Sequence, residues 1–266
     1  MKTLLIISIM LGVALLTSST VRQKYEYRKV ENTAFQANES LRYRVTWGIA
    51  DAGEVKMTVA KHPYKINGRS ALHVKAVGRT LGAFSLFYKV YDVYESYVDE
   101  QAMLPLKFKR DVYEGGYEIK QQYDFYHNNK VVYHKGKRFV VPENIQDMVS
   151  AFYYARLLNL EDAKVGDTFK FSIFLDNTIY PMKIKYLGKE TIKVRKGKFD
   201  CLKFAPLVEK GRYFTSEQDV SFWVSDDANK IPILVKAKIP VGWIKMHLVE
   251  WSGLKHELKK STNKKG

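Results

Sequence analysis

Two similar stretches of sequence decide the fold of this chain. Val93–Glu100 reads VYESYVDE, and three residues later Leu104–Lys109 reads LPLKFK. The pattern returns as VSFWVSDD at Val220–Asp227 and, again three residues later, as IPILVK at Ile231–Lys236, at a constant offset of 127 positions (220 minus 93). In each copy an extended apolar run ends at two acidic residues, and a second run opens with Pro after Leu or Ile.

Both stretches are predicted to form β-hairpins, with Asp99 and Glu100 at the tip of the first and Asp226 and Asp227 at the tip of the second. Acidic side chains suit a tip because they hydrogen-bond their own backbone there. Pro suits the start of a strand, where no ladder N–H is needed. Neighbouring residues on a strand point to opposite faces, so the two acids of a tip are not expected to share a metal or an acid–base role. The repeat predicts two similar β-rich halves, and chance similarity between two hairpins is the alternative.

Alternation of apolar and polar residues extends the strand pattern over two segments, 41–140 and 164–254. The opening run shows it most clearly, with one apolar face made of Leu41, Tyr43, Val45, Trp47 and Ile49. The links between runs are too short for parallel crossovers, so the strands are expected to be antiparallel.

One helix is expected between the two halves. Ile145–Leu160 carries apolar residues at helical spacing, and Asn144 is a candidate N-cap. An amphipathic helix must bury its apolar face. The fold class predicted is therefore mainly β: one strongly curved antiparallel sheet or incomplete barrel made of two similar halves, with this central helix packed on its concave side.

The ends of the chain are expected to lie outside the β domain of residues 41–254. Residues 1–20 combine Lys2 with the apolar run Leu4–Leu16 and a small polar end, which is typical of a secretory signal peptide. No Cys follows that run, so we expect a protein exported to the periplasm of a Gram-negative bacterium without a lipid anchor. Residues 21–40 are interpreted as a polar leader, and residues 255–266 as a basic disordered tail.

The charge of the chain favours anionic partners. The 266 residues include 44 Lys and Arg against 28 Asp and Glu, a formal net charge of +16. For an exported protein this indicates an anionic membrane surface or lipopolysaccharide rather than nucleic acid. The alternative, that the lysines serve only solubility, stays open, and no pattern indicates an oligomeric state.

No catalytic, metal-binding or cofactor-binding pattern is present, so we expect a protein that is not an enzyme. None of the six histidines pairs with another His or Cys at metal-ligand spacing, and there is no phosphate loop or nucleophile elbow. Cys201 has the apolar neighbours Phe199, Leu202 and Phe204 and is expected to be a buried, inert thiol. Arg156 interrupts the apolar face of the helix, which predicts either a buried ion pair with a carboxylate or a side chain that reaches the surface.

Aromatic residues make up 14% of the chain, which leaves room for an apolar groove beside the core. The candidates for lining it are Phe152, Tyr153, Trp223 and Trp243. The function predicted is a non-catalytic module that binds an apolar or lipid-like ligand near an anionic surface. The alternatives are a structural or assembly partner that acts through a sheet edge, and a hydrolase of envelope polymers. A solid aromatic core would leave no groove at all.

Several short motifs together resemble the DUF3108 family of exported bacterial proteins of unknown function. They are LRYRVTWGI at Leu41–Ile49, AGE at Ala52–Glu54, DMVSAFYYAR at Asp147–Arg156, GKFDC at Gly197–Cys201, WVSDD at Trp223–Asp227, Ile231–Pro232 and Val241–Gly242. The resemblance covers residues 39–251 and implies a Gram-negative envelope protein with no agreed activity. The acidic tip followed by an apolar residue and Pro is more loosely similar to the lipoprotein carriers, whose curved sheet wraps helices over an apolar cavity.

Overall fold

A computed structural model describes residues 25–207, 220–239 and 242–261 of the chain. The predicted signal peptide and residues 262–266 of the predicted tail lie outside these ranges. The described residues form 15 strands, two α-helices and one short 3-10 helix. The strands are β1 (Ser40–Trp47), β2 (Ala50–Val59), β3 (Tyr64–Ile66), β4 (Arg69–Thr80), β5 (Val90–Asp99), β6 (Pro105–Glu114), β7 (Tyr117–Tyr126), β8 (Val131–His134), β9 (Lys137–Val140), β10 (Thr168–Leu175), β11 (Thr178–Val194), β12 (Gly197–Pro206), β13 (Val220–Ser225), β14 (Pro232–Ile239) and β15 (Gly242–Ser252). The helices are α2 (Phe84–Phe87), η1 (His127–Asn129) and α3 (Met148–Ala155).

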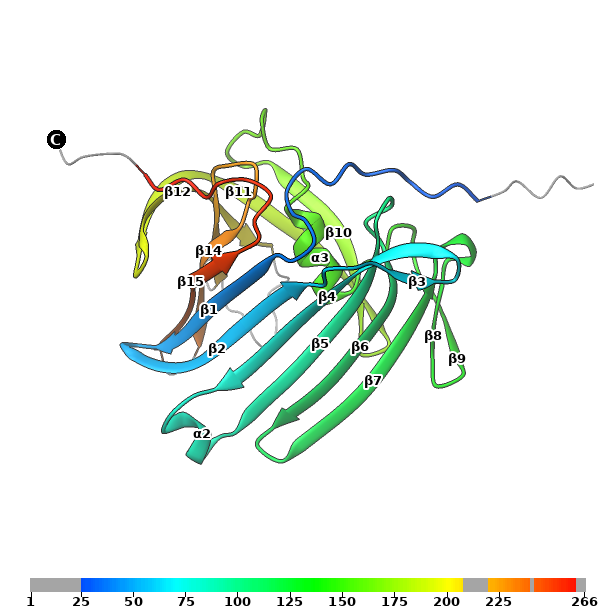
Figure 1. Cartoon of the computed structure of the whole chain (residues 1–266), viewed down its shortest axis with the longest axis horizontal. Helices are drawn as coiled ribbons and strands as arrows, with labels where there is room; N and C mark the ends of the chain where they lie inside the picture. Colours follow the sequence, from blue (N-terminus) through cyan, green and yellow to red (C-terminus); the bar gives the residue numbers. More distant parts are fainter. Residues whose placement is uncertain (1–24, 208–219, 240–241, 262–266) are drawn as a thin grey trace, which may run out of the picture.

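All strands belong to one sheet, and every strand pair in it is antiparallel. The order is β10-β11-β12-β13-β14-β15-β1-β2-β4-β5-β6-β7-β8-β9, with β3 paired to β4. The first and last strands therefore lie side by side in the middle of the sheet, from Ser40 opposite Ser252 to Trp47 opposite Ile244. The sheet curls around α3 without closing (Figure 1). The predicted fold class, a curved antiparallel sheet or incomplete barrel around one central helix, is confirmed.

The two repeated stretches are the hairpins β5–β6 and β13–β14, and they share a distinctive feature. Val98 pairs with Pro105 and Val224 with Pro232, and the register shifts by one residue just beyond each pair. The shift leaves one extra residue after each Pro, which makes a β-bulge. These two residues, Leu106 and Ile233, are almost fully buried.

The predicted offset of 127 positions does not hold for the first arms of the two hairpins. The second arms differ by 127 positions (232 minus 105), but the first arms differ by 126 (224 minus 98). The second tip thus contains one residue more, and its turn is built differently. Asp99 Oδ1 accepts hydrogen bonds from the backbone N–H groups two and three positions on, and in the second tip the same role falls to Asp227.

The helix is half as long as the sequence pattern predicts. Its N-cap is Asp147, whose Oδ1 accepts hydrogen bonds from the backbone N–H groups of Val149 and Ser150, both at 2.8 Å. The residue before it, Gln146, bridges to β10 instead, so the predicted N-cap Asn144 lies outside the helix. At the other end Arg156 N–H bonds the Tyr153 carbonyl, three residues back, and tightens the last turn.

The predicted leader is part of the folded domain. Arg28 donates to the carbonyls of Ala102 and Met103 in the first hairpin tip, at 2.8 and 3.0 Å. Further on, Phe35 and Glu39 are almost completely buried. The segment that was expected to be a polar approach to the domain therefore covers one end of the barrel.

The beginning of the predicted disordered tail is also anchored. Leu258 is buried, and the backbone of His256 bonds the side chain of Asn229 in the second hairpin tip. The Ser261 N–H donates to the Lys198 carbonyl at 2.9 Å. The prediction of disorder is therefore wrong for residues 255–261, because these contacts satisfy backbone groups that a free tail would leave to water.

The shared bulge generates a first test. Truncating Leu106 or Ile233 to Ala should lower the free energy of unfolding by about 2–5 kcal/mol each, because both side chains fill fully packed positions. Val140→Ala is the control, since that side chain is 66% exposed and should change stability by less than about 0.5 kcal/mol. Urea unfolding measures all three, and a small effect at only one bulge would show that the two hairpins do not carry equal structural roles.

Candidate functional site

The N-terminus of α3 is held by a buried carboxyl. Asp147 caps the helix and also accepts a hydrogen bond from Ser96 Oγ of β5 at 2.6 Å, while the Asp147 N–H donates to Ser150 Oγ. Burial raises the pKa of Asp147 from 3.8 to about 6, although the hydrogen bonds to its oxygens oppose this shift. The helix is therefore fixed to the first half of the sheet at this end.

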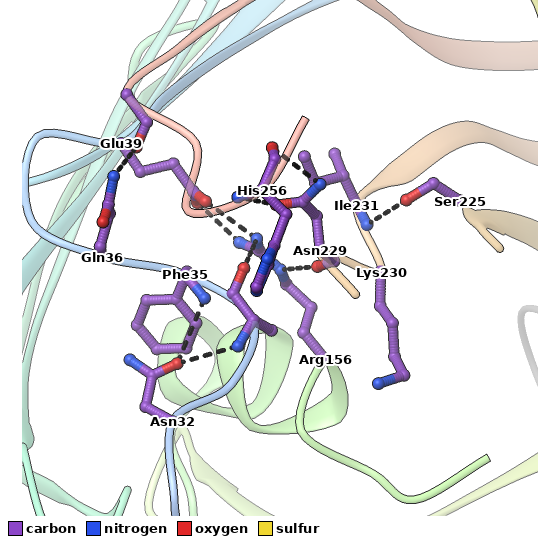
Figure 2. Close-up of polar contacts among 12 residues, drawn as sticks. Asn32, Phe35, Gln36, Glu39, Arg156, Ser225, Asn229, Lys230, Ile231 and His256 are labelled. Carbon is purple, nitrogen blue, oxygen red and sulfur yellow. Dashed lines mark hydrogen bonds and ion pairs between the residues drawn. The ribbon is translucent and has the colours of Figure 1, made fainter. Parts of the chain in front are cut away.

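The other end of α3 carries a buried ion pair. Arg156 Nη1 donates to Glu39 Oε1 at 2.6 Å and Nη2 donates to Oε2 at 2.9 Å. The guanidinium also bonds the Asn229 carbonyl at 2.9 Å and the Ala34 carbonyl at 3.2 Å. Figure 2 shows these contacts converging from the helix, the leader and the second hairpin tip. Burial disfavours the charge of Arg156, but the hydrogen bonds to Glu39 and the Coulombic attraction of Glu39, Tyr153 and Tyr43 together outweigh this and raise its pKa.

An apolar cavity of about 350 Å³ lies between α3 and the second half of the sheet. The helix contributes Met148, Ala151, Phe152 and Ala155. The strands contribute a row of directly paired residues on the inner face, from Phe204 through Phe222 and Val235 to Met246. The rings of Phe204 and Phe222 stack with centroids 5.5 Å apart. Further lining residues are Leu158, Leu160, Phe171, Ile173, Met182, Ile184, Pro206, Val220, Val224 and Pro232.

Two cations border this cavity, and they differ in how they are paired. Arg156 is fully engaged by Glu39 and the two carbonyls. Lys230 is half-buried, and burial lowers its pKa. Within the ranges that the structure describes, its ammonium makes no hydrogen bond or ion pair, and Figure 2 shows its side chain leading away from the Arg156 cluster. Lys230 is therefore the cation available to a group bound at this rim.

Of the four predicted groove residues, Phe152 lines the cavity and the other three do not. Tyr153 lies on another side of the helix, where its ring packs against Phe35 with centroids 4.7 Å apart. Trp223 is next to Phe222 on a strand and so points to the opposite face, where Nε1 donates to Glu190 at 2.9 Å. Trp243 also lies away from the cavity, with Lys236 Nζ 4.0 Å from its ring centroid.

The acidic residues of the hairpin tips have separate partners. Asp99 pairs with Arg69, and the Glu100 N–H bonds the Ser70 carbonyl. Asp226 accepts from Lys189 Nζ at 2.6 Å, whereas Asp227 caps its own turn. Over the described ranges no three His, Cys, Asp or Glu residues are grouped so as to hold a metal ion.

Other reactive groups lie outside the cavity. Burial raises the pKa of the Cys201 thiol to about 12, so the thiol stays protonated at neutral pH. His73 Nε2 lies 2.6 Å from Glu95 Oε2, but this pair belongs to neighbouring strands of the first half, and the His73 ring stacks on Tyr97. Among the residues described, no helix is long and apolar enough to cross a membrane.

The fold and the site define a β-barrel-like protein with an apolar cavity beneath its central helix. The chain belongs to the DUF3108 family of proteins of unknown function, whose profile matches residues 42–249. The resemblance inferred from the short motifs is thereby confirmed. No curated protein matches the chain.

One solved structure shows the same kind of fold at low sequence identity, and two others are less similar. A β-barrel-like protein of the DUF1849 family from Brucella abortus superposes with a TM-score of 0.52 and 10% identity, covering 86% of this chain and all of that one. A protein described as a predicted lipoprotein from Parabacteroides distasonis gives a TM-score of 0.35 at 10% identity, covering 85% of this chain and all of that one. An exported protein with a YmcC-like fold from Bacteroides fragilis gives 0.31 at 11% identity, covering 84% and 99% of the two chains.

The buried ion pair leads to a second test. Glu39→Gln should lower the free energy of unfolding by about 3–5 kcal/mol, because it leaves the Arg156 charge buried without its partner. Glu39→Gln combined with Arg156→Met should recover part of that loss. The exposed pair Lys120–Asp111 provides the control, and Asp111→Asn should cost less than about 1 kcal/mol. Equal losses for Glu39→Gln and Asp111→Asn in urea unfolding would contradict this account.

The raised pKa of Asp147 leads to a third test. The folded state binds the proton of this carboxyl more tightly than the unfolded state, so its contribution to stability is full below about pH 4 and is lost as the pH rises through about 6. Asp147→Asn keeps a capping oxygen and removes the titration. The unfolding free energy of the natural chain minus that of the variant should therefore fall by roughly 3 kcal/mol between about pH 4 and 7.

Asp92, whose pKa burial also raises to about 6, is present in both chains and cancels in this difference. Urea unfolding at several pH values gives the measurement, with Asp162→Asn at an exposed position as the control. A difference that stays constant with pH would show that Asp147 is ionised in the folded protein throughout.

Proposed function

We propose that this protein is an exported, non-catalytic module that binds an apolar, lipid-like ligand in the cavity beneath α3. The observation that carries the proposal is the cavity itself, about 350 Å³ of space walled by aliphatic and aromatic side chains. Small-molecule sites in proteins occupy roughly 300–1,000 Å³ and are mostly apolar with a few placed polar groups. The ligand proposed is of the size of one acyl chain rather than a whole membrane lipid.

The position of Lys230 favours a ligand that has an acidic polar end. Its side chain borders the apolar space at the end where the second hairpin tip meets the helix, and its ammonium is partly removed from water. An acidic head group placed there would form a charge-assisted hydrogen bond. An anionic amphiphile such as a fatty acid satisfies both parts of the site, the apolar chain inside and the charge at the rim.

The cellular setting proposed rests on the ends and the charge of the chain. The predicted signal peptide, without a Cys after it, favours release into the periplasm of a Gram-negative cell. The net charge of +16 would bring the protein to acidic lipid head groups or lipopolysaccharide. Each Lys or Arg near such a surface contributes on the order of 1 kcal/mol.

The alternative of assembly through a sheet edge has weaker support. The edge strand β9 has four residues, two of them Lys137 and Arg138, and the opposite edge β10 carries Lys170 and is bridged by Gln146 at Ile173. Short, charged or covered edges are how proteins prevent strand addition. The hydrolase alternative has no support from the cavity, since the described residues of its wall include neither His nor Asp nor Glu.

The proposal is tested by ligand binding to two variants. Ala155→Trp places a large side chain in the cavity, so it should abolish binding of oleate, measured by displacement of the fluorescent probe anilinonaphthalene sulfonate. Lys230→Gln should weaken oleate binding about tenfold, the equivalent of about 1.4 kcal/mol, and leave binding of uncharged oleyl alcohol unchanged.

Two exposed positions supply matched controls, Ala228→Trp and Lys164→Gln, neither of which should change binding. Urea unfolding establishes that each variant is folded. Oleate binding that survives in a folded Ala155→Trp protein would rule out the cavity as the binding site, and equal weakening of oleate and oleyl alcohol by Lys230→Gln would rule out the head-group role.

A further inference from the structure

One end of the sheet exposes large apolar side chains that a folded protein normally buries. Ile49 in the β1–β2 turn is fully exposed, at 100%, and in α2 Leu86 is 85% and Phe87 is 89% exposed. We call these three residues the apolar tip. Figure 1 shows α2 and the β1–β2 turn along the same lower left edge of the sheet. Exposed apolar residues that gather in this way mark an interaction surface.

Contacts with the neighbouring strands and turns fix the position of the apolar tip. The ring of Trp47, just before the β1–β2 turn, meets the ring of Phe84 in α2 with centroids 6.1 Å apart. The Leu81 N–H, just before α2, donates to the Ala52 carbonyl of β2 at 2.9 Å. On the other side of α2 the Tyr88 ring lies directly over Gly115 of the β6–β7 turn. These contacts fix the position of the tip, so the exposure of its three side chains is a property of the folded structure.

Aromatic and basic residues surround the apolar tip. Tyr88, Tyr91 and Tyr117 are 55%, 51% and 59% exposed. Exposed lysines nearby are Lys89 after α2, and Lys238 and Lys245 in the two strands beyond β1. Three acidic residues are also near: Asp51, which is paired with Arg195, and Glu114 and Glu118 on either side of the β6–β7 turn.

We propose that the apolar tip docks this protein on a lipid bilayer. Apolar side chains that protrude from a turn and a short helix, with Tyr and Lys behind them, match the layers of a bilayer from the acyl chains to the head groups. The tip also lies at the same end of the sheet as one end of the cavity. Val220 of the cavity wall is in one cross-strand row with Ala237, Ile244 and Trp47, and Trp47 leads directly into the Ile49 turn.

The test uses the chain without its predicted signal peptide, because the apolar run of residues 4–16 would itself enter a bilayer. Vesicles of equal parts phosphatidylglycerol and phosphatidylethanolamine are sedimented with the protein at about 0.15 M salt. The natural chain should bind, and the triple variant Ile49→Ser, Leu86→Ser, Phe87→Ser should bind at least about tenfold more weakly. The loss of affinity is expected because the variant no longer buries three large apolar side chains in the bilayer.

The matched control is Val140→Ser with Val165→Ser, two exposed apolar residues away from the tip at 66% and 71% exposure, and it should bind like the natural chain. Failure of the natural chain to bind, or equal binding by the triple variant, would overturn the proposal. A tip-dependent dimer in sedimentation velocity without vesicle binding would assign the surface to a second copy instead. Oleate binding by the triple variant is measured separately, so failure of the docking surface is distinguishable from failure of the cavity.

Discussion

The buried Arg156 guanidinium is the point on which the arrangement of this protein depends. It terminates the helix, and it binds Glu39 at the start of β1, the Ala34 carbonyl of the leader and the Asn229 carbonyl of the second hairpin tip. A charge removed from water must keep all of its partners, because the loss of any one leaves an unpaired polar group in the interior. Three segments far apart in the sequence, the helix, the leader and the second hairpin tip, are thereby held at one end of the barrel.

This constraint explains why residues 25–39 belong to the domain. The leader crosses both hairpin tips: Arg28 bonds the first, and the Ala34–Glu39 segment meets the second through Arg156. The tips of the two repeated hairpins thus both contact the leader or its partner Arg156, although the hairpins lie in different halves of the sheet. The chain past β15 adds to it where His256 bonds Asn229.

The regular part of the fold could be predicted from the sequence because it follows from local patterns. Alternation predicted the strands, the short links between them predicted that they are antiparallel, and the acidic tips with Pro after Leu or Ile located both hairpins. The errors lie where a distant partner decides the outcome. The helix begins at Met148, after its N-cap Asp147, because Gln146 is bridged to β10. The end of the polar leader is buried because Glu39 pairs with Arg156, 117 positions away. The extra residue in the second tip is invisible to an alignment made without gaps.

The candidate site was harder to predict, because a cavity depends on which face of each strand curves inward. Trp223 was a candidate for the groove, but it is one position from Phe222 and therefore points to the other face of its strand. Arg156 itself could be recognised, since a cation on an apolar helix face must be paired or reach the surface. Its partner could not be predicted, because no local pattern connects it to the leader.

The two halves of the sheet share a hairpin but differ in how their interiors are filled. Phe174 of β10 packs edge-on against Tyr123 and Phe125 of the first half, with centroids 5.2 and 6.4 Å apart, so aromatic rings fill the interior there. The side of α3 that faces the second half carries two alanines, Ala151 and Ala155, and the space beside them is the cavity. Unfilled apolar space forgoes packing energy in proportion to its volume, and native stability is small enough for such a loss to matter. An apolar cavity in the second half, bordered by a Lys230 ammonium that makes no ion pair within the described ranges, has the form expected when a ligand completes the packing of that half.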